Sequence, residues 1–173
     1  MVRAMITQNL NRVSEVPTID LWNALIRKAV NDGYFYKTVS LYRQMKQNGV
    51  KPNKLTFPFV AKACAKLLDI RQSLIIHAHI LKSPFSCNAF VGTAVIDMYV
   101  KCDYLECACN VFDKMPNRDV ALWNVMLLGF AQSGSVDRFF CLFRQMRHEG
   151  MTPDSVSIIG LTQTVAELEN AFW

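Results

Sequence analysis

Residues 41–53 read Leu-Tyr-Arg-Gln-Met-Lys-Gln-Asn-Gly-Val-Lys-Pro-Asn, and residues 142–154 read Leu-Phe-Arg-Gln-Met-Arg-His-Glu-Gly-Met-Thr-Pro-Asp. The second stretch begins 101 residues after the first. At the same offset the whole window 19–53 aligns with 120–154 without a gap, including a Leu-Trp-Asn tripeptide near the start of each. A fixed offset held over this length is typical of a repeat array and not of one globular domain.

Each copy contains an apolar pattern of helical spacing, followed by a sequence that ends a helix. Val39, Tyr42 and Met45 recur every three residues, which places them on one face of a helix. Gly49 and then Pro52 follow them, and this order is typical of a helix C-terminus. A further apolar helical segment precedes this one in each copy. Each unit is therefore predicted to be a pair of helices joined by a short turn.

The whole chain divides into units of this kind. The first three have 35, 35 and 31 residues and together span the 101 residues of the offset. Helix pairs of this length bury their apolar faces only against neighbouring pairs, so the expected fold is all-α, a right-handed α-solenoid of helix-turn-helix repeats. It has about four complete repeats and one partial repeat, at residues 19–53, 54–88, 89–119, 120–154 and 155–173.

The composition is that of a folded protein with no expected membrane partner. Hydrophobic residues make up 51% of the chain and charged residues 19%, unlike a disordered chain. No apolar run approaches the roughly 18 to 20 residues that a membrane-spanning helix requires. The net charge of +5 is compatible with a polyanionic partner, although a solvated basic surface has the same composition.

The six cysteines do not match a known metal-binding spacing. No Cys-x-x-Cys pair occurs, and the members of His77-x-His79 and Cys107-x-Cys109 would point to different sides of a helix. We therefore expect no metal and no other cofactor, and we expect reduced, buried thiols. The cysteines are Cys64, Cys87, Cys102, Cys107, Cys109 and Cys141.

Both ends of the chain are unusual for a repeat array. Residues 1–18 contain Arg3 and Arg12 and no acidic residue before Glu15, which indicates either the remnant of an organellar targeting segment or a truncated beginning. The last unit ends about where its second helix should begin, so Phe172 and Trp173 are expected to be exposed. These features suggest a fragment, or a shortened gene product, of a longer protein.

The repeated segments resemble the pentatricopeptide repeats of plant organelles. Residues 41–53 and 142–154 are similar to the family's second helix and closing turn. Residues 111–119 (Val-Phe-Asp-Lys-Met-Pro-Asn-Arg-Asp) are similar to the end of its short repeat, and residues 61–65 with 76–82 are similar to its long repeat. The order standard, long, short, standard, long is that of the mixed-length subclass of land plants.

This resemblance implies sequence-selective binding of single-stranded RNA in mitochondria or chloroplasts, as a specificity factor in RNA editing or processing. In that subclass a deaminase domain acts in the same chain or is supplied in trans. The present sequence contains neither His-x-Glu nor Pro-Cys-x-x-Cys, the residues that a zinc deaminase requires. We therefore expect no enzymatic activity, and a deaminase supplied by other editing-complex proteins.

The resemblance also implies that the fifth and last residues of each unit read one base. In unit two the fifth residue is Pro58, which has no polar side chain, so this unit is interpreted as a spacer. The predicted RNA tract is pyrimidine, any base, G, U in the 5′ to 3′ direction. The same residue types are common helix caps, which is the alternative role. The predicted base-reading residues are Asn23, Asn53, Asn88, Thr93, Asp119, Asn124 and Asp154.

Two further sets of residues are predicted from the family pattern. Leu55, Phe90 and Val156 occupy the second position, where an apolar side chain stacks on a base, while packing against the next repeat is the alternative. The other two units depart from this pattern, with Asp20 and Ala121.

Lys66 and Lys101 share position thirteen and are predicted phosphate contacts, although a solvated lysine is the common alternative. Trp22 and Trp123 are expected in the core rather than as base-stacking platforms.

Two other functions remain open from the sequence. A protein-binding helical scaffold of the tetratricopeptide type has similar helix pairs, but it does not need polar residues that recur at the fifth position. A non-functional, truncated remnant would account for the unfinished last repeat.

Overall fold

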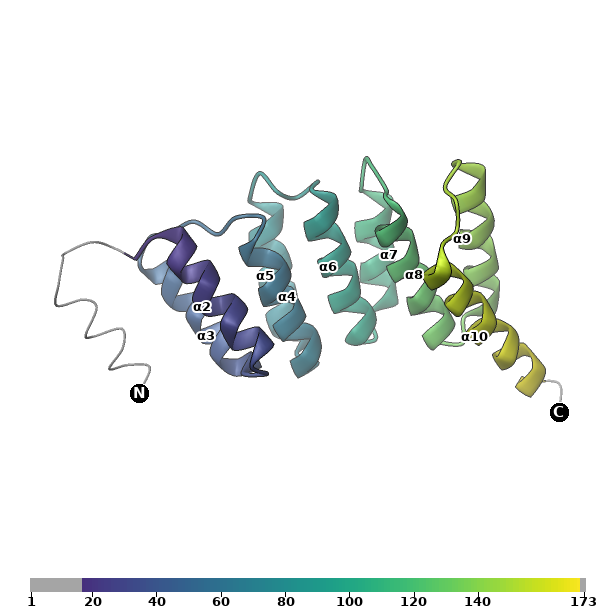
Figure 1. Cartoon of the computed structure of the whole chain (residues 1–173), viewed down its shortest axis with the longest axis horizontal. Coiled ribbons are helices and arrows are strands. Elements are labelled where there is room, and N and C mark those ends of the chain that lie inside the picture. Colours follow the sequence, from purple (N-terminus) through teal and green to yellow (C-terminus); the bar gives the residue numbers. More distant parts are fainter. Residues whose placement is uncertain (1–16, 172–173) are drawn as a thin grey trace.

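The computed structural model describes residues 17–171, and this part of the chain is all-helical. Figure 1 shows the helices in a single row of pairs that runs from the N-terminal to the C-terminal end. This arrangement confirms the all-α solenoid predicted from the sequence. The helices are α2 (Ile19–Asn31), α3 (Phe35–Gln47), α4 (Thr56–Leu67), α5 (Ile70–Leu81), α6 (Ala89–Lys101), α7 (Leu105–Asp113), α8 (Val120–Gln132), α9 (Val136–His148) and α10 (Ser155–Ala171).

The helices form two layers with different neighbours. The first helices of successive units, α2, α4, α6, α8 and α10, pack against one another along the row. The second helices, α3, α5, α7 and α9, pack against first helices, and within the described residues they make no close backbone contact with one another. The layer of first helices is therefore the continuous one, and it carries every predicted base-reading residue within a helix.

The turn inside each helix pair needs a left-handed backbone at the same position of the unit. Gly33 (φ +78°) and Gly134 (φ +66°) adopt it in units one and four. Leu68 (φ +52°) and Asp103 (φ +62°) adopt it in units two and three. A residue with a Cβ is strained in this conformation by roughly 1–2 kcal/mol, so the packing of the solenoid imposes the turn even where the local sequence does not favour it.

The fourth residue of each unit belongs to the core. Trp22 and Trp123 are 4% and 0% exposed, as predicted, and Phe57 of unit two is 1% exposed. Unit three has Gly92 instead, and a Cβ added there would lie 2.5 Å from the terminal methyl of Met115. Met115 therefore occupies, from the end of the unit, the space that a large fourth residue fills elsewhere.

The cysteine prediction was wrong in its burial. Cys64 is buried, but Cys87 and Cys141 are exposed and the other three are half-buried, because they lie on outer helices or loops that no neighbour covers. All six are free thiols. In residues 17–171 no three His, Cys, Asp or Glu side chains come together in a way that could hold a metal ion.

None of the described helices has the length and apolar character needed to cross a membrane. The expectations about residues 1–16 and about Phe172 and Trp173 concern parts of the chain outside the described residues.

Candidate nucleic-acid interface

Two of the predicted base-reading residues meet in unit one. The Asn23 amide nitrogen donates to Asn53 Oδ1 at 3.2 Å, although 30 residues separate them. Asn53 Oδ1 also accepts the backbone N–H groups of Leu55 at 2.9 Å and Thr56 at 3.1 Å, at the start of α4. The Thr56 hydroxyl donates to Asn23 Oδ1 at 2.6 Å. These contacts form a closed polar cluster between α2 and α4.

Unit four contains the same cluster, built from the equivalent residues. The Asn124 amide nitrogen donates to Asp154 Oδ1 at 2.9 Å. Asp154 Oδ1 accepts the backbone N–H groups of Val156 at 2.9 Å and Ser157 at 3.0 Å. The Ser157 hydroxyl donates to Asn124 Oδ1 at 2.5 Å. An identical hydrogen-bond pattern therefore recurs 101 residues further along the chain.

The electrostatics of the second cluster favour a charged Asp154. The hydrogen bond from the backbone N–H of Ser157, with further ones from Asn124 and Val156, lowers the pKa of the Asp154 carboxyl below its usual value. Hydrogen bonds to the ionised form stabilise it. The carboxylate is therefore an acceptor at neutral pH, and it holds the Asn124 amide by its nitrogen side.

Both amides are more covered than the sequence reading expected. Asn23 is 9% exposed and Asn124 is 5% exposed. The reason is that one N–H and one lone pair of each amide are used within the protein, which draws the side chains against their partners. An asparagine amide has two donors and accepts two hydrogen bonds, so each retains one donor and one acceptor.

Units two and three lack this cluster. The Thr93 hydroxyl donates to the Ala89 carbonyl of its own helix at 2.9 Å. Asn88 Oδ1 accepts the Val91 N–H at 3.2 Å, and Asp119 Oδ1 accepts the Leu122 N–H at 2.9 Å. These two side chains cap α6 and α8, which is the alternative role considered for them. The structure thus brings the predicted pairs together in units one and four but not in units two and three.

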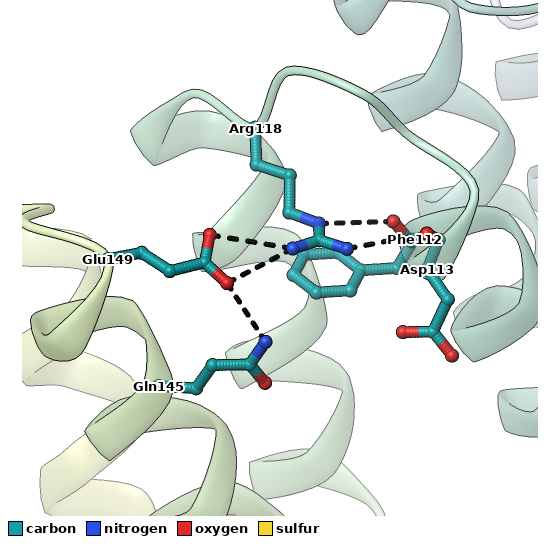
Figure 2. A network of polar contacts seen from close by, with 5 residues as sticks. All are labelled: Phe112, Asp113, Arg118, Gln145 and Glu149. Carbon is teal, nitrogen blue, oxygen red and sulfur yellow. Dashed lines mark hydrogen bonds and ion pairs between the residues drawn. The ribbon is translucent and has the colours of Figure 1, made fainter.

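The loop that carries Asp119 is held by Arg118. Figure 2 shows the Arg118 guanidinium over the Phe112 ring, 4.6 Å from its centroid, with Nε donating to the Phe112 carbonyl at 3.2 Å. Its Nη1 contacts Glu149 Oε1 at 3.1 Å, and Glu149 in turn accepts from Gln145 Nε2 at 2.9 Å. Since α7 has only 9 residues, Arg118 satisfies carbonyls at its end and links unit three to α9.

The predicted stacking residues differ in exposure. Leu55 and Phe90 are 48% and 59% exposed, unusually high for large apolar side chains, and Val156 is half-buried. Among the predicted phosphate contacts, Lys66 is exposed, whereas Lys101 Nζ lies 2.6 Å from Asp97 Oδ2. A phosphate at Lys101 has to compete with that carboxylate.

Sequence reasoning missed Thr56 and Ser157, which are 0% exposed and complete the two clusters. A signal for them was present, because a hydroxyl residue stands three positions after the last residue of both units that have an asparagine at position five. Their role depends on which side chains the fold brings near, and the spacing alone does not reveal that.

The comparisons with known proteins agree with this architecture. Residues 17–66 match the PPR repeat family, and residues 93–120 and 121–151 each match the PPR repeat. The mitochondrial pentatricopeptide repeat-containing protein At4g19191 of Arabidopsis thaliana is 47% identical over 163 residues, which is 94% of this chain and 25% of the relative. A chloroplastic pentatricopeptide repeat-containing protein of the same plant is 35% identical over 149 residues, covering 86% of this chain and 28% of the relative.

Solved structures give the same fold. The crystal structure of PPR10 in complex with an 18-nt psaJ RNA element has a TM-score of 0.77 at 20% identity, over 95% of this chain and 24% of that one. The nuclear proteinaceous RNase P 2 of Arabidopsis thaliana has a TM-score of 0.59 at 14% identity, over 84% of this chain and 34% of that one.

The chain spans about a quarter of the length of the curated relatives described above. Their names, mitochondrial and chloroplastic, confirm the organellar location expected from the sequence. The family matches cover more than half of the chain and include both asparagine-containing units. The chain belongs to the pentatricopeptide repeat family.

Proposed function

We propose that this chain binds single-stranded RNA with sequence selectivity and acts as a specificity factor in organellar RNA editing or processing. The observation that carries the proposal is the recurrence of one polar cluster at the same place in units one and four. A protein-binding scaffold has no need for such a repeat, whereas a protein that reads one base per unit does. The 18-nt RNA element bound to PPR10 supports RNA as the partner class.

The chemistry of the clusters suits a pyrimidine. Asn23 and Asn124 each retain one donor and one acceptor, and this combination matches the Watson–Crick edge of cytosine or uracil. The exposed carboxylate of Asp119 is acceptor-only, and it suits the N–H groups of guanine. The proposed tract is therefore pyrimidine, any base, G, U, with unit two as the spacer.

Exposed apolar side chains support base stacking beside these readers. Leu55 directly precedes Thr56 of the first cluster, and Phe90 directly follows the first residue of α6. Stacking on such side chains contributes affinity to any base, because every base has an apolar face. The half-buried Val156 is the equivalent residue beside the second cluster.

The role is proposed to be recognition without catalysis. Editing in this scheme depends on a deaminase supplied in trans by other proteins of an editing complex. The absence of both deaminase motifs from this sequence supports that division of labour.

The test is a binding titration with a short RNA that carries the pyrimidine-N-G-U tract. Shuffled RNA and duplex DNA of the same length are the comparison ligands, at two salt concentrations. We expect the tract to bind more tightly than either, with all three weakened by salt. Equal binding to all three would reject sequence reading.

A single substitution sharpens this test. Asn124→Ser is expected to change the preferred base at one nucleotide only, that opposite unit four. Asn124→Ser protein that kept the wild-type preference at every nucleotide would show that Asn124 is not a reader.

The two alternatives have their own signatures in these assays. A protein that melts cooperatively but binds no RNA would favour a protein-binding scaffold. A protein without a cooperative melt would favour a non-functional remnant.

A further inference from the structure

We propose that Thr56 and Ser157 are positioning residues, which set the orientation of the asparagine amide in the unit before their own. Each occupies the third position of its unit, and neither is among the residues predicted to touch RNA. The proposal rests on the proposed RNA-binding function, since it assigns a specificity role to residues behind the readers.

The hydrogen bonds of each hydroxyl leave one direction for its proton. The Asn53 backbone N–H donates to the Thr56 hydroxyl oxygen at 3.0 Å, so this contact uses a lone pair. The proton then points to Asn23 Oδ1 at 2.6 Å rather than to Asn53 Oδ1 at 3.1 Å, because the shorter contact is the stronger one.

The Ser157 hydroxyl behaves in the same way. It accepts the Asp154 backbone N–H at 3.2 Å. It donates to Asn124 Oδ1 at 2.5 Å, while Asp154 Oδ1 lies farther away at 3.3 Å.

The opposite amide orientation has no comparable partners. Asp154 Oδ1 and Asn53 Oδ1 are fixed as acceptors by the backbone N–H groups at the start of α10 and α4. A flipped Asn124 or Asn23 would place its oxygen against these acceptors. The hydroxyl supplies the second contact, so both ends of each amide are held.

Units two and three serve as an internal comparison. The residues equivalent to Thr56 and Ser157 are Val91 and Leu122, which have no hydroxyl and are 1% and 0% exposed. The residues that would read the base before them are Pro58 and Thr93, which have no amide. Within this chain a third-position hydroxyl therefore occurs after an asparagine reader and not after the other two.

The consequence concerns which atoms face a base. With the amide held at both ends, one N–H and one lone pair point away from the cluster in a fixed order. A pyrimidine edge with the complementary order is accepted, and one with the reversed order is not. Without the hydroxyl the amide can rotate, so base discrimination weakens even though the reader itself is unchanged.

The experiment uses Thr56→Val and Ser157→Ala, which remove the hydroxyl, with Thr56→Ser and Ser157→Thr as hydroxyl-retaining controls. The first readout needs no RNA: hydrogen exchange of the asparagine side-chain amides is followed by NMR. We expect Thr56→Val to speed exchange at Asn23 by about three- to tenfold, the size expected for one lost hydrogen bond, and to leave Asn124 unchanged. Ser157→Ala should do the reverse.

The second readout is base preference, measured with RNAs that vary one nucleotide opposite unit one or unit four. Thr56→Val should reduce discrimination opposite unit one by about three- to tenfold and leave unit four unchanged. The hydroxyl-retaining controls should behave as the wild type.

The outcomes separate this proposal from the proposed function. A variant that lowers the melting temperature but leaves the amide exchange of its asparagine unchanged would show that the hydroxyl only caps the helix, which overturns the proposal. If the wild-type protein shows no base preference, the proposed function fails, and the NMR readout still decides whether the hydroxyls orient the amides.

Discussion

Units three (89–119) and four (120–154) are neighbours in one solenoid, yet the same positions carry different chemistry. Unit four has a buried Trp123 followed by Asn124, whose amide is held by Asp154 and Ser157. Unit three has Gly92, with Met115 filling the space, followed by a threonine that bonds to its own helix. Both units form the same helix pair, so the polar cluster is not required for the fold.

The difference also separates two ways of joining repeats. Unit four is joined to the start of α10 through side chains at its reading position. Unit three is joined to α9 by Arg118, which lies outside that position and contacts Glu149. A unit that does not use an amide cluster thus obtains its inter-unit contacts elsewhere.

The largest expected effect comes from the fourth residue. Trp123→Ala should lower the free energy of unfolding by about 3–5 kcal/mol, because it leaves a cavity in the middle of the array beside Phe112, whose ring centroid lies 4.9 Å away. Trp22→Ala should fall in the lower half of that range, since α2 has neighbours on one side only among the described helices. Urea denaturation measures both. Equal losses would contradict the distinction between inner and terminal units.

The next effect tests the clusters. Asn124→Ala should cost about 1–3 kcal/mol of unfolding free energy, because it leaves the buried Ser157 hydroxyl without its acceptor. The matched control is Thr93→Ala at the same position of unit three, expected to cost less than about 0.5 kcal/mol, since that hydroxyl serves only its own helix. A larger loss for Thr93→Ala would show that unit three holds a contact equivalent to the cluster.

A pH effect is expected from the outer helices of units one to three. His77 Nδ1 lies 2.8 Å from the Tyr99 hydroxyl, and His79 Nδ1 lies 3.0 Å from the Tyr42 hydroxyl. Burial lowers the pKa of both histidines, with nearby lysines as a further cause.

The neutral histidines therefore stabilise the fold fully above the ordinary pKa of 6.5. As pH falls below 6.5 the unfolded chain takes up protons first, and stability is lost until the lowered pKa values are reached. Thermal melts between pH 7.5 and 5.5 measure this loss, which His77→Gln should reduce. An unchanged pH dependence in that variant would mean that His77 does not contribute.

The smallest expected effect concerns the lysines at position thirteen. Lys66→Ala should lower the slope of log affinity against log salt by about 0.7, the value for one phosphate of a single strand. Lys101→Ala should lower it less, because Asp97 lies 2.6 Å from the Lys101 ammonium. RNA titrations at several salt concentrations measure both slopes, and Asp97→Asn should bring Lys101 level with Lys66. A slope unaffected by Lys66→Ala would remove this residue from the interface.

Much of the fold was predictable because it depends on local patterns. The apolar spacing in 39–45 and the breakers after it define helices without reference to distant residues. The burial of Trp22 and Trp123 followed from their place on those helices. The exposure of Cys87 and Cys141 did not follow, because it depends on which faces the neighbouring units leave uncovered.

The candidate site was predictable in its residue types but not in its contacts. The pairing of Asn23 with Asn53 and of Asn124 with Asp154 joins residues 30 positions apart, and the roles of Thr56 and Ser157 depend on that pairing. Asn88 and Asp119 have similar side chains at the same position, yet they only cap helices. Composition and register do not distinguish these cases.

The amino-acid sequence by itself determined the helix pairs, their repeat length and the residues placed at each register position, because these depend on helical periodicity and on turns of a few residues. Only the tertiary structure decided which register positions become hydrogen-bonded clusters. That outcome requires two successive first helices to pack closely enough for a hydroxyl of one to reach an amide of the other, and hydrogen bonds form only over such short distances.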